Sequence, residues 1–222
     1  PSVVNDSRGF FTSRVFGTFV QEGLRLLAEG VHPAKIEMAA LKAGMPVGPL
    51  AIQDEVSLTL SEHVANETRK ALQAEGKDRP RSGADDVIEI MIHQFQRKGK
   101  AAGAGFYDYP ENGKKHLWDG LSHWKKDTDI SEQEMIDRFL FVQSLDTLRC
   151  FEEGVLESVV DANVGSIFGI GFAPWTGGAL QFLNQYGLEK ALLRANVLEA
   201  KYGARFKAPQ LLIDKIPHGK ID

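Results

Sequence analysis

Apolar residues recur at helical spacing through most of this 222-residue chain, and this pattern limits its fold more than any other feature. Near the start, Phe11, Val15 and Phe19 are four residues apart and place one apolar stripe on a helix. This row predicts a helix over residues 9–29, ended by Gly30. Alternating patterns typical of strands are almost absent. The sequence therefore predicts a mainly helical chain.

Turn-forming residues divide the rest of the chain into further helices. The predicted ranges are 33–44, 50–56, 61–74, 87–99 and a helix from 131 onward. Residues 44–49 (GMPVGP) hold two prolines and two glycines, which predicts a stiff turn. Residues 99–130 show a weaker pattern and are expected to join two helical halves. Ser131 and Glu134 have the spacing of a capping box at the start of the last long helix.

The two halves of the chain resemble each other. Residues 34–36 and Pro46 are matched by residues 162–164 and Pro174 at a constant offset (162 − 34 = 174 − 46 = 128). An internal duplication explains this likeness, and chance is the alternative. The predicted organisation is a first repeat over residues 1–110, a linker over 111–130 and a second repeat over 131–222. The fold class is therefore all-α, with no Rossmann domain in the chain.

Composition excludes several functional classes. The net charge is −4, so the chain offers no general attraction to nucleic acid or to anionic membranes. No apolar stretch reaches the roughly 18 residues that a membrane span requires. Cys150 is the single cysteine, which favours a reducing compartment and is expected to be a small buried hydrophobe.

Chemistry-bearing motifs are scarce. The glycines of residues 99–105 and 169–171 follow no predicted strand, so they favour structural turns over a nucleotide-binding loop. The six histidines lack metal-ligand spacing, and no metal site is expected. From the residues alone, the chain reads as a helical packing or dimerisation module. Because it opens at Pro1 without an initiator Met, it is expected to be a piece of a longer polypeptide.

An ordered set of segments resembles a known family. The segments are residues 5–14 (NDSRGFFTSR), 44–49 (GMPVGP) with Asp54 following, 98–109 (KGKAAGAGFYDY) and 171–178 (GFAPWTGG). In this order they are similar to motifs in the C-terminal region of 3-hydroxyacyl-CoA dehydrogenases, including those of the multifunctional fatty acid β-oxidation enzymes.

The resemblance implies a pair of all-α repeats that follow a Rossmann domain, with an enoyl-CoA hydratase domain before it. The family's catalytic histidine and glutamate, and its NAD-binding residues, belong to the Rossmann domain. In the complete enzyme the histidine takes the proton of the 3-hydroxyl while hydride passes to NAD. No catalytic or cofactor-binding residue is therefore expected here. The 222-residue chain alone is expected to be inactive and to bind NAD weakly or not at all.

The resemblance also implies a set of substrate-binding residues. Ser13 stands where the family has an asparagine near the reacting acyl group. A hydroxyl is shorter than a carboxamide, so either a water bridges the gap or Ser13 caps or packs on its own helix. Met45, Pro46 and Val47 would form a rigid apolar lip beside the acyl chain. Phe168 matches an aromatic position of the second repeat.

The expected partners are the upstream Rossmann and hydratase domains, an acyl-CoA substrate and a thiolase subunit. The chain does not end in the peroxisomal tripeptide S-K-L, and a bacterial cytoplasmic enzyme is the simplest expectation. Two alternatives remain open at this point. One is a non-enzymatic helical interaction module, and the other is the helical domain of a dehydrogenase whose substrate is not a thioester.

Overall fold

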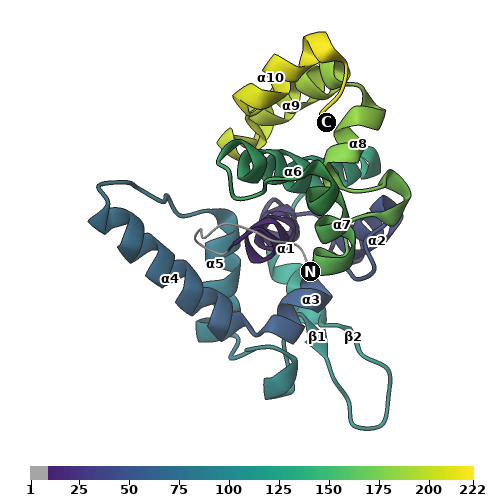
Figure 1. Ribbon diagram of the computed structural model, residues 1–222. Coiled ribbons are helices and arrows are strands. Elements are labelled where there is room, and N and C mark those ends of the chain that lie inside the picture. Colours follow the sequence, from purple (N-terminus) through teal and green to yellow (C-terminus); the bar gives the residue numbers. More distant parts are fainter. Residues whose placement is uncertain (1–9) are drawn as a thin grey trace. The chain divides into compact units, whose positions relative to one another are not determined.

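The computed structural model describes residues 10–222, which are built almost entirely of helices (Figure 1). In this part of the chain the α-helices are α1 (Thr12–Ala28), α2 (Pro33–Ala43), α3 (Pro49–Val56), α4 (Leu58–Ala74), α5 (Gly83–Glu89), α6 (Glu132–Glu152), α7 (Val159–Ile170), α8 (Ala179–Tyr186), α9 (Leu188–Tyr202) and α10 (Gln210–Lys215). A π-helical turn, Ile90–Gln94, continues α5. Short 3-10 segments cover Lys100–Ala102, Asp119–Trp124, Pro174–Thr176, Ala204–Phe206 and Ile216–His218. The all-α prediction is confirmed.

One predicted helix ends earlier than expected. The helix predicted over residues 87–99 is wrong at both ends, because α5 begins at Gly83 and regular helix stops at Glu89. After the π-helical turn, Gln96 takes a φ of 56°, which ends any helical path. The Arg97 side chain then donates from Nε to the Gly105 carbonyl oxygen (2.6 Å). The apolar period of the sequence therefore continues to Phe95, beyond the end of regular helix at Glu89, because the contact of Arg97 with Gly105 is not visible in that period.

A small hairpin interrupts the region expected to lack strands. β1 (Tyr107–Asp108) pairs antiparallel with β2 (His116–Leu117), and Tyr107 lies opposite Leu117. Each strand has only two residues, so the hairpin needs support from neighbouring groups. Arg97 provides part of this support by donating to the Tyr107 carbonyl oxygen and to the Asp108 carboxylate.

The chain divides into two compact units. In its described part, unit 1 comprises residues 10–19, 41–46 and 133–222, and unit 2 comprises residues 20–40 and 47–132. Helix α1 thus contributes its first turns to unit 1 and its later turns to unit 2. The units follow spatial contact, whereas the boundaries at residues 110 and 131 were inferred from sequence likeness, so the repeat boundaries remain a prediction.

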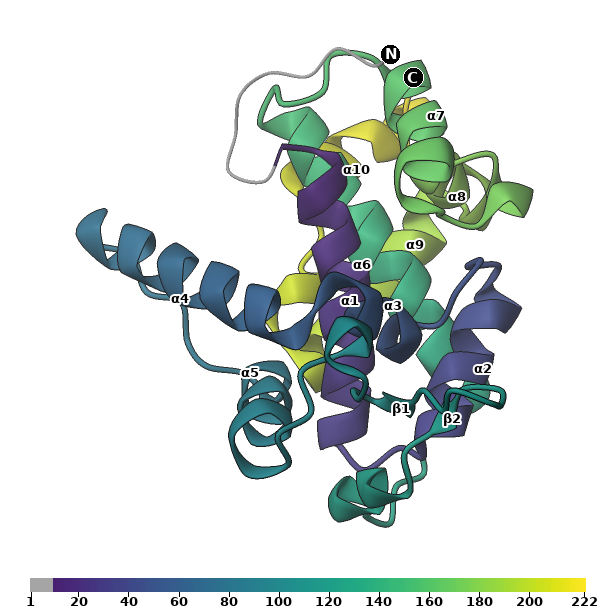
Figure 2. The ribbon, with the colours of Figure 1, turned by 90° about the horizontal axis from the view of Figure 1, so that it is seen from below.

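Unit 1 is organised around α6. The residues predicted for its apolar face, Met135, Phe139, Val142 and Leu145, are all buried. The start of α1 lies against α6 (Figure 2), where the rings of Phe19 and Phe139 meet edge to face at 5.3 Å. Cys150, near the end of α6, is fully buried as expected, and burial raises the pKa of its thiol to about 12.

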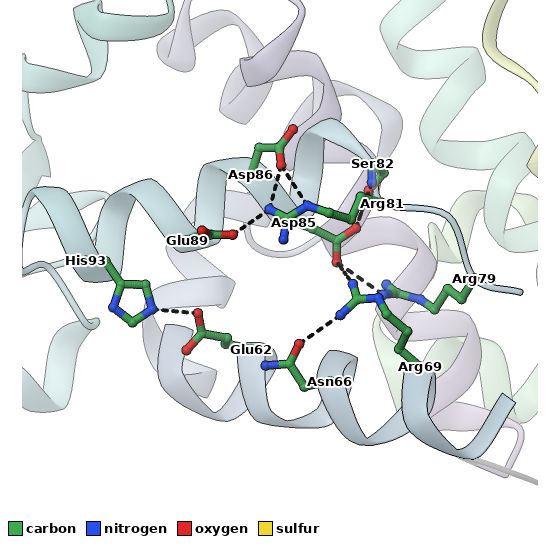
Figure 3. A network of polar contacts seen from close by, with 10 residues as sticks. All are labelled: Glu62, Asn66, Arg69, Arg79, Arg81, Ser82, Asp85, Asp86, Glu89 and His93. Atoms are coloured by element: carbon green, nitrogen blue, oxygen red, sulfur yellow. Dashed lines mark hydrogen bonds and ion pairs between the residues drawn. The ribbon is translucent and has the colours of Figure 1, made fainter. Parts of the chain in front are cut away.

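Unit 2 is built from close helix contacts and an ionic surface. A Cβ atom added to Gly23 on α1 would lie 2.3 Å from Cγ of Pro49, the first residue of α3. This glycine therefore lets α3 approach α1 at short range. An ion pair joins α4 to α5 (Figure 3), because Arg69 on α4 lies 3.7 Å from the carboxylate of Asp85 on α5. The Asp85 carboxylate also accepts the Ser82 amide and pairs with Arg79, which fixes the start of α5.

The same local device appears in both halves. In unit 2, the Glu37 carboxylate on α2 accepts hydrogen bonds from amides in the first turn of α3. In unit 1, the side-chain oxygen of Asn163 on α7 accepts the amides of Leu180 and Gln181 in the first turn of α8, both at 3.0 Å. In each case a short helix presents an acceptor to the free N–H groups of the next one. The two acceptors do not occupy equivalent positions at the offset of 128 residues, because Glu37 corresponds to Gly165 and Asn163 to Lys35. The duplication therefore stays a prediction.

Candidate functional site

The first predicted site residue, Ser13, is exposed in the opening turn of α1. It is the second residue of that helix rather than its N-cap, and its hydroxyl has no hydrogen-bond partner among residues 10–222. The neighbouring Arg14 is held tightly. Its guanidinium donates to both carboxylate oxygens of Asp146 on α6 and to both oxygens of Glu153. Ser13 therefore presents an exposed hydroxyl, without a partner in the described part of the chain, from a turn that Arg14 anchors.

The bend after α2 is only partly exposed. Met45 is 3% exposed, and its sulfur accepts a hydrogen bond from Gln143 on α6 at 3.8 Å. Its side chain therefore supports the bend from inside unit 1, instead of forming the exposed lip that was expected. Pro46 and Val47 are exposed. Pro46 belongs to unit 1 together with Ser13, whereas Val47 belongs to unit 2.

Phe168, in the last turns of α7, is 86% exposed and so presents nearly its whole ring to solvent. Two glycines near it mark close approaches within unit 1. A Cβ atom on Gly169 would lie 3.0 Å from the side chain of Thr12, and one on Gly171 would lie 2.9 Å from Cγ of Pro46. The start of α1, the bend and the end of α7 therefore converge, although they lie far apart in the sequence.

A residue that the sequence reasoning left unassigned fixes this arrangement. The indole N–H of Trp175 donates to the carbonyl oxygen of Ala43 at 2.8 Å. The same ring fills the space where Gly44 would carry a side chain, since a Cβ atom there would lie 2.8 Å from the indole. Trp175 is still 61% exposed. Its place in the segment GFAPWTGG was the available signal, but the sequence gives no indication that its partner is the end of α2.

In unit 2, the buried carboxylate of Glu37 explains the GMPVGP segment. It accepts the Leu50 amide (2.8 Å), the Ala51 amide (3.3 Å) and the Tyr107 hydroxyl (2.7 Å). A Cβ atom on Gly48 would lie 2.4 Å from this carboxylate. Glycine is therefore required at position 48 so that Glu37 can reach the first turn of α3.

Asp54 performs the equivalent task for the segment GFYDY. Its two carboxylate oxygens accept the Phe106 amide (2.8 Å), the Tyr107 amide (2.9 Å) and the Tyr109 hydroxyl (2.8 Å). A Cβ atom on Gly105 would lie 1.9 Å from Asp54 Oδ1. The glycines, the aspartate and the tyrosines of these segments thus form one hydrogen-bonded lock inside unit 2.

Burial controls the ionisation of this lock. Loss of hydration raises the pKa of both Glu37 and Asp54, and the hydrogen bonds that each carboxylate accepts oppose the rise. Burial, and then the nearby carboxylates, also raise the pKa of the Tyr107 and Tyr109 hydroxyls, which therefore stay protonated and donate. Because every oxygen has a donor, the lock has a structural chemistry rather than that of an acid–base catalyst.

Metal and nucleotide binding find no support in the described residues. No group of three or more His, Cys, Asp or Glu side chains among residues 10–222 is arranged to hold a metal ion. The strands there form only the short hairpin, so the parallel sheet that positions a dinucleotide is not part of this fold. The candidate glycines serve contacts instead: Gly105 makes room for Asp54, and Gly171 ends α7 in the left-handed conformation. Among residues 10–222, the structure therefore shows no arrangement typical of a dinucleotide site.

These features define a class: a helical module in which the start of α1, the bend at Pro46 and the end of α7 approach one another within unit 1. Residues 9–109 match the family model described as 3-hydroxyacyl-CoA dehydrogenase, C-terminal domain. The chain belongs to the C-terminal, helical region of the 3-hydroxyacyl-CoA dehydrogenase family.

Relatives extend the match beyond the first half. Over 209 residues, which are 93% of this chain, it is 32% identical to a fatty acid oxidation complex subunit alpha of Vibrio cholerae and covers 28% of that protein. A subunit of the same name from Vibrio vulnificus is 30% identical over 99% of the chain, which covers 30% of it. The chain therefore spans less than a third of the length of these relatives.

Two solved structures share the fold. A 3-hydroxybutyryl-CoA dehydrogenase from Escherichia coli aligns with 99% of this chain and 62% of its own, with a TM-score of 0.71 and 18% identity. The dehydrogenase part of multifunctional enzyme 1 from C. elegans aligns with 94% of this chain and 48% of its own, with a TM-score of 0.64 and 18% identity. No helix in the described part of the chain is long and apolar enough to cross a membrane.

Proposed function

We propose that this chain is the substrate-side helical part of an NAD-dependent 3-hydroxyacyl-CoA dehydrogenase that acts in fatty acid β-oxidation. The convergence of Ser13, Pro46 and Phe168 in unit 1 carries the proposal. These three positions were chosen from separate motifs, and residues next to them approach one another across more than 120 residues of sequence (168 − 46 = 122). An exposed hydroxyl beside apolar surface suits a thioester with an acyl chain.

In this proposal each residue has a distinct task. Ser13 meets the acyl group, through a water where the hydroxyl is too short to reach. Pro46 and Phe168 supply apolar surface for the acyl chain, while buried Met45 holds the bend rigid. Val47, which is exposed, stays a predicted substrate-binding residue. A preformed surface of this kind loses little conformational entropy on binding.

The remaining chemistry is assigned to the polypeptide that precedes this chain. Family membership implies NAD as the cofactor, and the helical fold described above does not fit it. The NAD-binding domain and its proton-transfer residues are therefore expected upstream, as is a hydratase domain. A thiolase subunit is a further expected partner, and the bacterial cytoplasm is the expected location.

The decisive experiment compares the chain with and without its upstream part. The full-length polypeptide should reduce acetoacetyl-CoA with NADH, and the 222-residue chain alone should not. Detectable turnover by the 222-residue chain would refute the assignment of the chemistry to the upstream part. A full-length protein that lacks turnover and does not bind acyl-CoA would refute the proposed function.

A second candidate function has its own observation. Val160, Val164 and Phe168 lie one helical turn apart on α7 and are 70%, 46% and 86% exposed. Such an apolar stripe also suits a protein partner, as in a non-enzymatic interaction module. The two functions differ in the upstream sequence: a chain that lacks a dinucleotide-binding fingerprint there would favour the module. A helical domain with a non-thioester substrate predicts instead that acyl-CoA gives no protection against proteolysis.

A further inference from the structure

Arg14, which directly follows Ser13, makes ionic contacts with Asp146 on α6 and with Glu153, the residue after α6. Its Nε and Nη2 atoms lie 3.2 Å from the two oxygens of Asp146, which gives a fork-shaped, bidentate pair. Its Nη1 and Nη2 atoms donate to the two oxygens of Glu153 at 2.5 and 3.1 Å. The Asp146 side chain is 10% exposed, so this pair is shielded from water much more than a surface salt bridge is.

Asp146 is itself held from the other side. Arg149 lies 3.4 Å from its Oδ1 atom and donates through Nη2 to the carbonyl oxygens of Arg205 and Lys207. The acceptor of Arg14 is therefore fixed by the segment that follows α9. The hydrogen bond from Arg14 also lowers the pKa of Glu153, so this carboxylate is charged at neutral pH.

The first turn of α1 needs such an anchor. A helix end lacks intrahelical partners for its first N–H groups, and this opening turn contains no acidic residue to compensate the helix dipole. The apolar contact of Phe19 with Phe139 holds α1 against α6 but lies more than one turn beyond Ser13. Phe11 and Val15 of this turn are buried, and Thr12 approaches the backbone at Gly169. Among the side-chain hydrogen bonds described for residues 10–15, those of Arg14 are the ones that tie the turn that carries Ser13 to Asp146 and Glu153.

We infer that Arg14 is a positioning residue for Ser13 and acts through Asp146 and Glu153 of the second half of the chain. The inference rests on the proposed function and deepens it, because it assigns the second repeat a role in orienting the substrate-facing hydroxyl of the first. A serine is shorter than an asparagine, so a small displacement of its helix turn removes a contact that a longer side chain would keep. Catalytic constellations lose activity when supporting groups allow displacements of about 0.5–1 Å.

The test compares Arg14→Ala, Arg14→Lys and Glu153→Gln in the full-length polypeptide. Arg81→Ala is the matched control, because Arg81 also pairs with two carboxylates, those of Asp86 and Glu89, in unit 2 (Figure 3). Two readouts are measured for each variant. One is amide hydrogen exchange over residues 15–18, since the Val15 amide is the first hydrogen-bonded one of this turn. The other is the pair of KM values for acetoacetyl-CoA and NADH.

Arg14→Ala should accelerate exchange over residues 15–18 about tenfold and raise the KM for acetoacetyl-CoA at least fivefold, with the KM for NADH within twofold of wild type. Arg14→Lys keeps the charge without the fork and should fall between. Arg81→Ala should change neither readout. Glu153 is half exposed, so Glu153→Gln provides a folded variant with a smaller shift of the same kind if Arg14→Ala does not fold.

The positioning role alone would be overturned if the wild type is active but its Arg14 and Glu153 variants show the same exchange rates and the same two KM values as Arg81→Ala. Equal increases in the two KM values would also overturn it, because a general loss of structure does not select one substrate. A wild type without dehydrogenase activity would overturn the proposed function on which the inference rests, even where exchange over residues 15–18 responds as expected.

Discussion

Removing the Asp54 carboxylate should destabilise unit 2 strongly. Asp54→Ala leaves the Phe106 and Tyr107 amides and the Tyr109 hydroxyl without their acceptor. Phe106 is fully buried, so water cannot replace the lost partner there. A buried donor left without an acceptor costs about 1–3 kcal/mol. One buried and one part-buried amide therefore predict a loss of about 3 kcal/mol, after allowing for the burial cost of the carboxylate that is removed.

Urea unfolding at pH 7 and 25 °C measures this loss. For a slope of about 3 kcal/mol per molar urea, the midpoint should fall by about 1 M. Tyr109→Phe deletes a single hydrogen bond and should cost about 1 kcal/mol. Asp86→Ala is the control: Asp86 is a 57% exposed partner of Arg81, and its loss should cost no more than about 0.5 kcal/mol. A midpoint for Asp54→Ala equal to that of the control would refute the lock.

Three further outcomes follow from the same structure. Gly105→Ala should lower the urea midpoint, because the new Cβ would lie 1.9 Å from Asp54. Gly17→Ala is the control: its Cβ would have no atom within 4 Å, so this variant should be more stable by about 0.5–1 kcal/mol. Equal midpoints for the two variants would contradict the steric role of Gly105. Burial raises the folded pKa of Glu37 above its unfolded value of about 4.3, so its contribution is fully present below that value and is lost as the pH rises through the raised pKa. Wild type should therefore gain stability relative to Glu37→Gln as the pH falls from 7 to 5, and a constant difference would argue against it. Cys150 should resist thiol reagents at pH 8 until the protein unfolds, and rapid labelling of the native protein would show that its burial is misjudged.

The helices were predictable because their information is local. An apolar row at helical spacing identifies α1 and α6 without knowledge of their neighbours, and proline and glycine mark the turn at residues 44–49. The end of α5, in contrast, is determined by residues that are distant in the sequence. Phe95 continued the apolar period, but its ring meets Trp118 at 4.9 Å outside any regular helix, and Arg97 is drawn toward residues 105–108. Such long-range contacts are not encoded in the period of a single segment.

The candidate site divides in the same way. Ser13 and Phe168 were selected by the family resemblance, and both are exposed. Met45 was selected on the same grounds, yet its side chain is buried against Gln143, a residue 98 positions away. The anchoring of Arg14 by α6 was also not predictable, since charge type alone does not identify the partner of an arginine. The motifs identified candidate site residues, but tertiary contacts determine which of these side chains are exposed to solvent.

The lock in unit 2 clarifies what the motif resemblance can and cannot establish. Gly48 and Gly105 are required because a side chain at either position would collide with the carboxylate of Glu37 or Asp54. Both carboxylates are buried, so neither is presented to solvent as a reactive group. A chain that retained only the fold would therefore keep these residues as faithfully as an active enzyme. The motif thus identifies the helical scaffold, whereas the choice between dehydrogenase and interaction module depends on residues outside the lock. Among those, Ser13 is the most informative, because its exposed hydroxyl makes no hydrogen bond to residues 10–222 that would stabilise the scaffold.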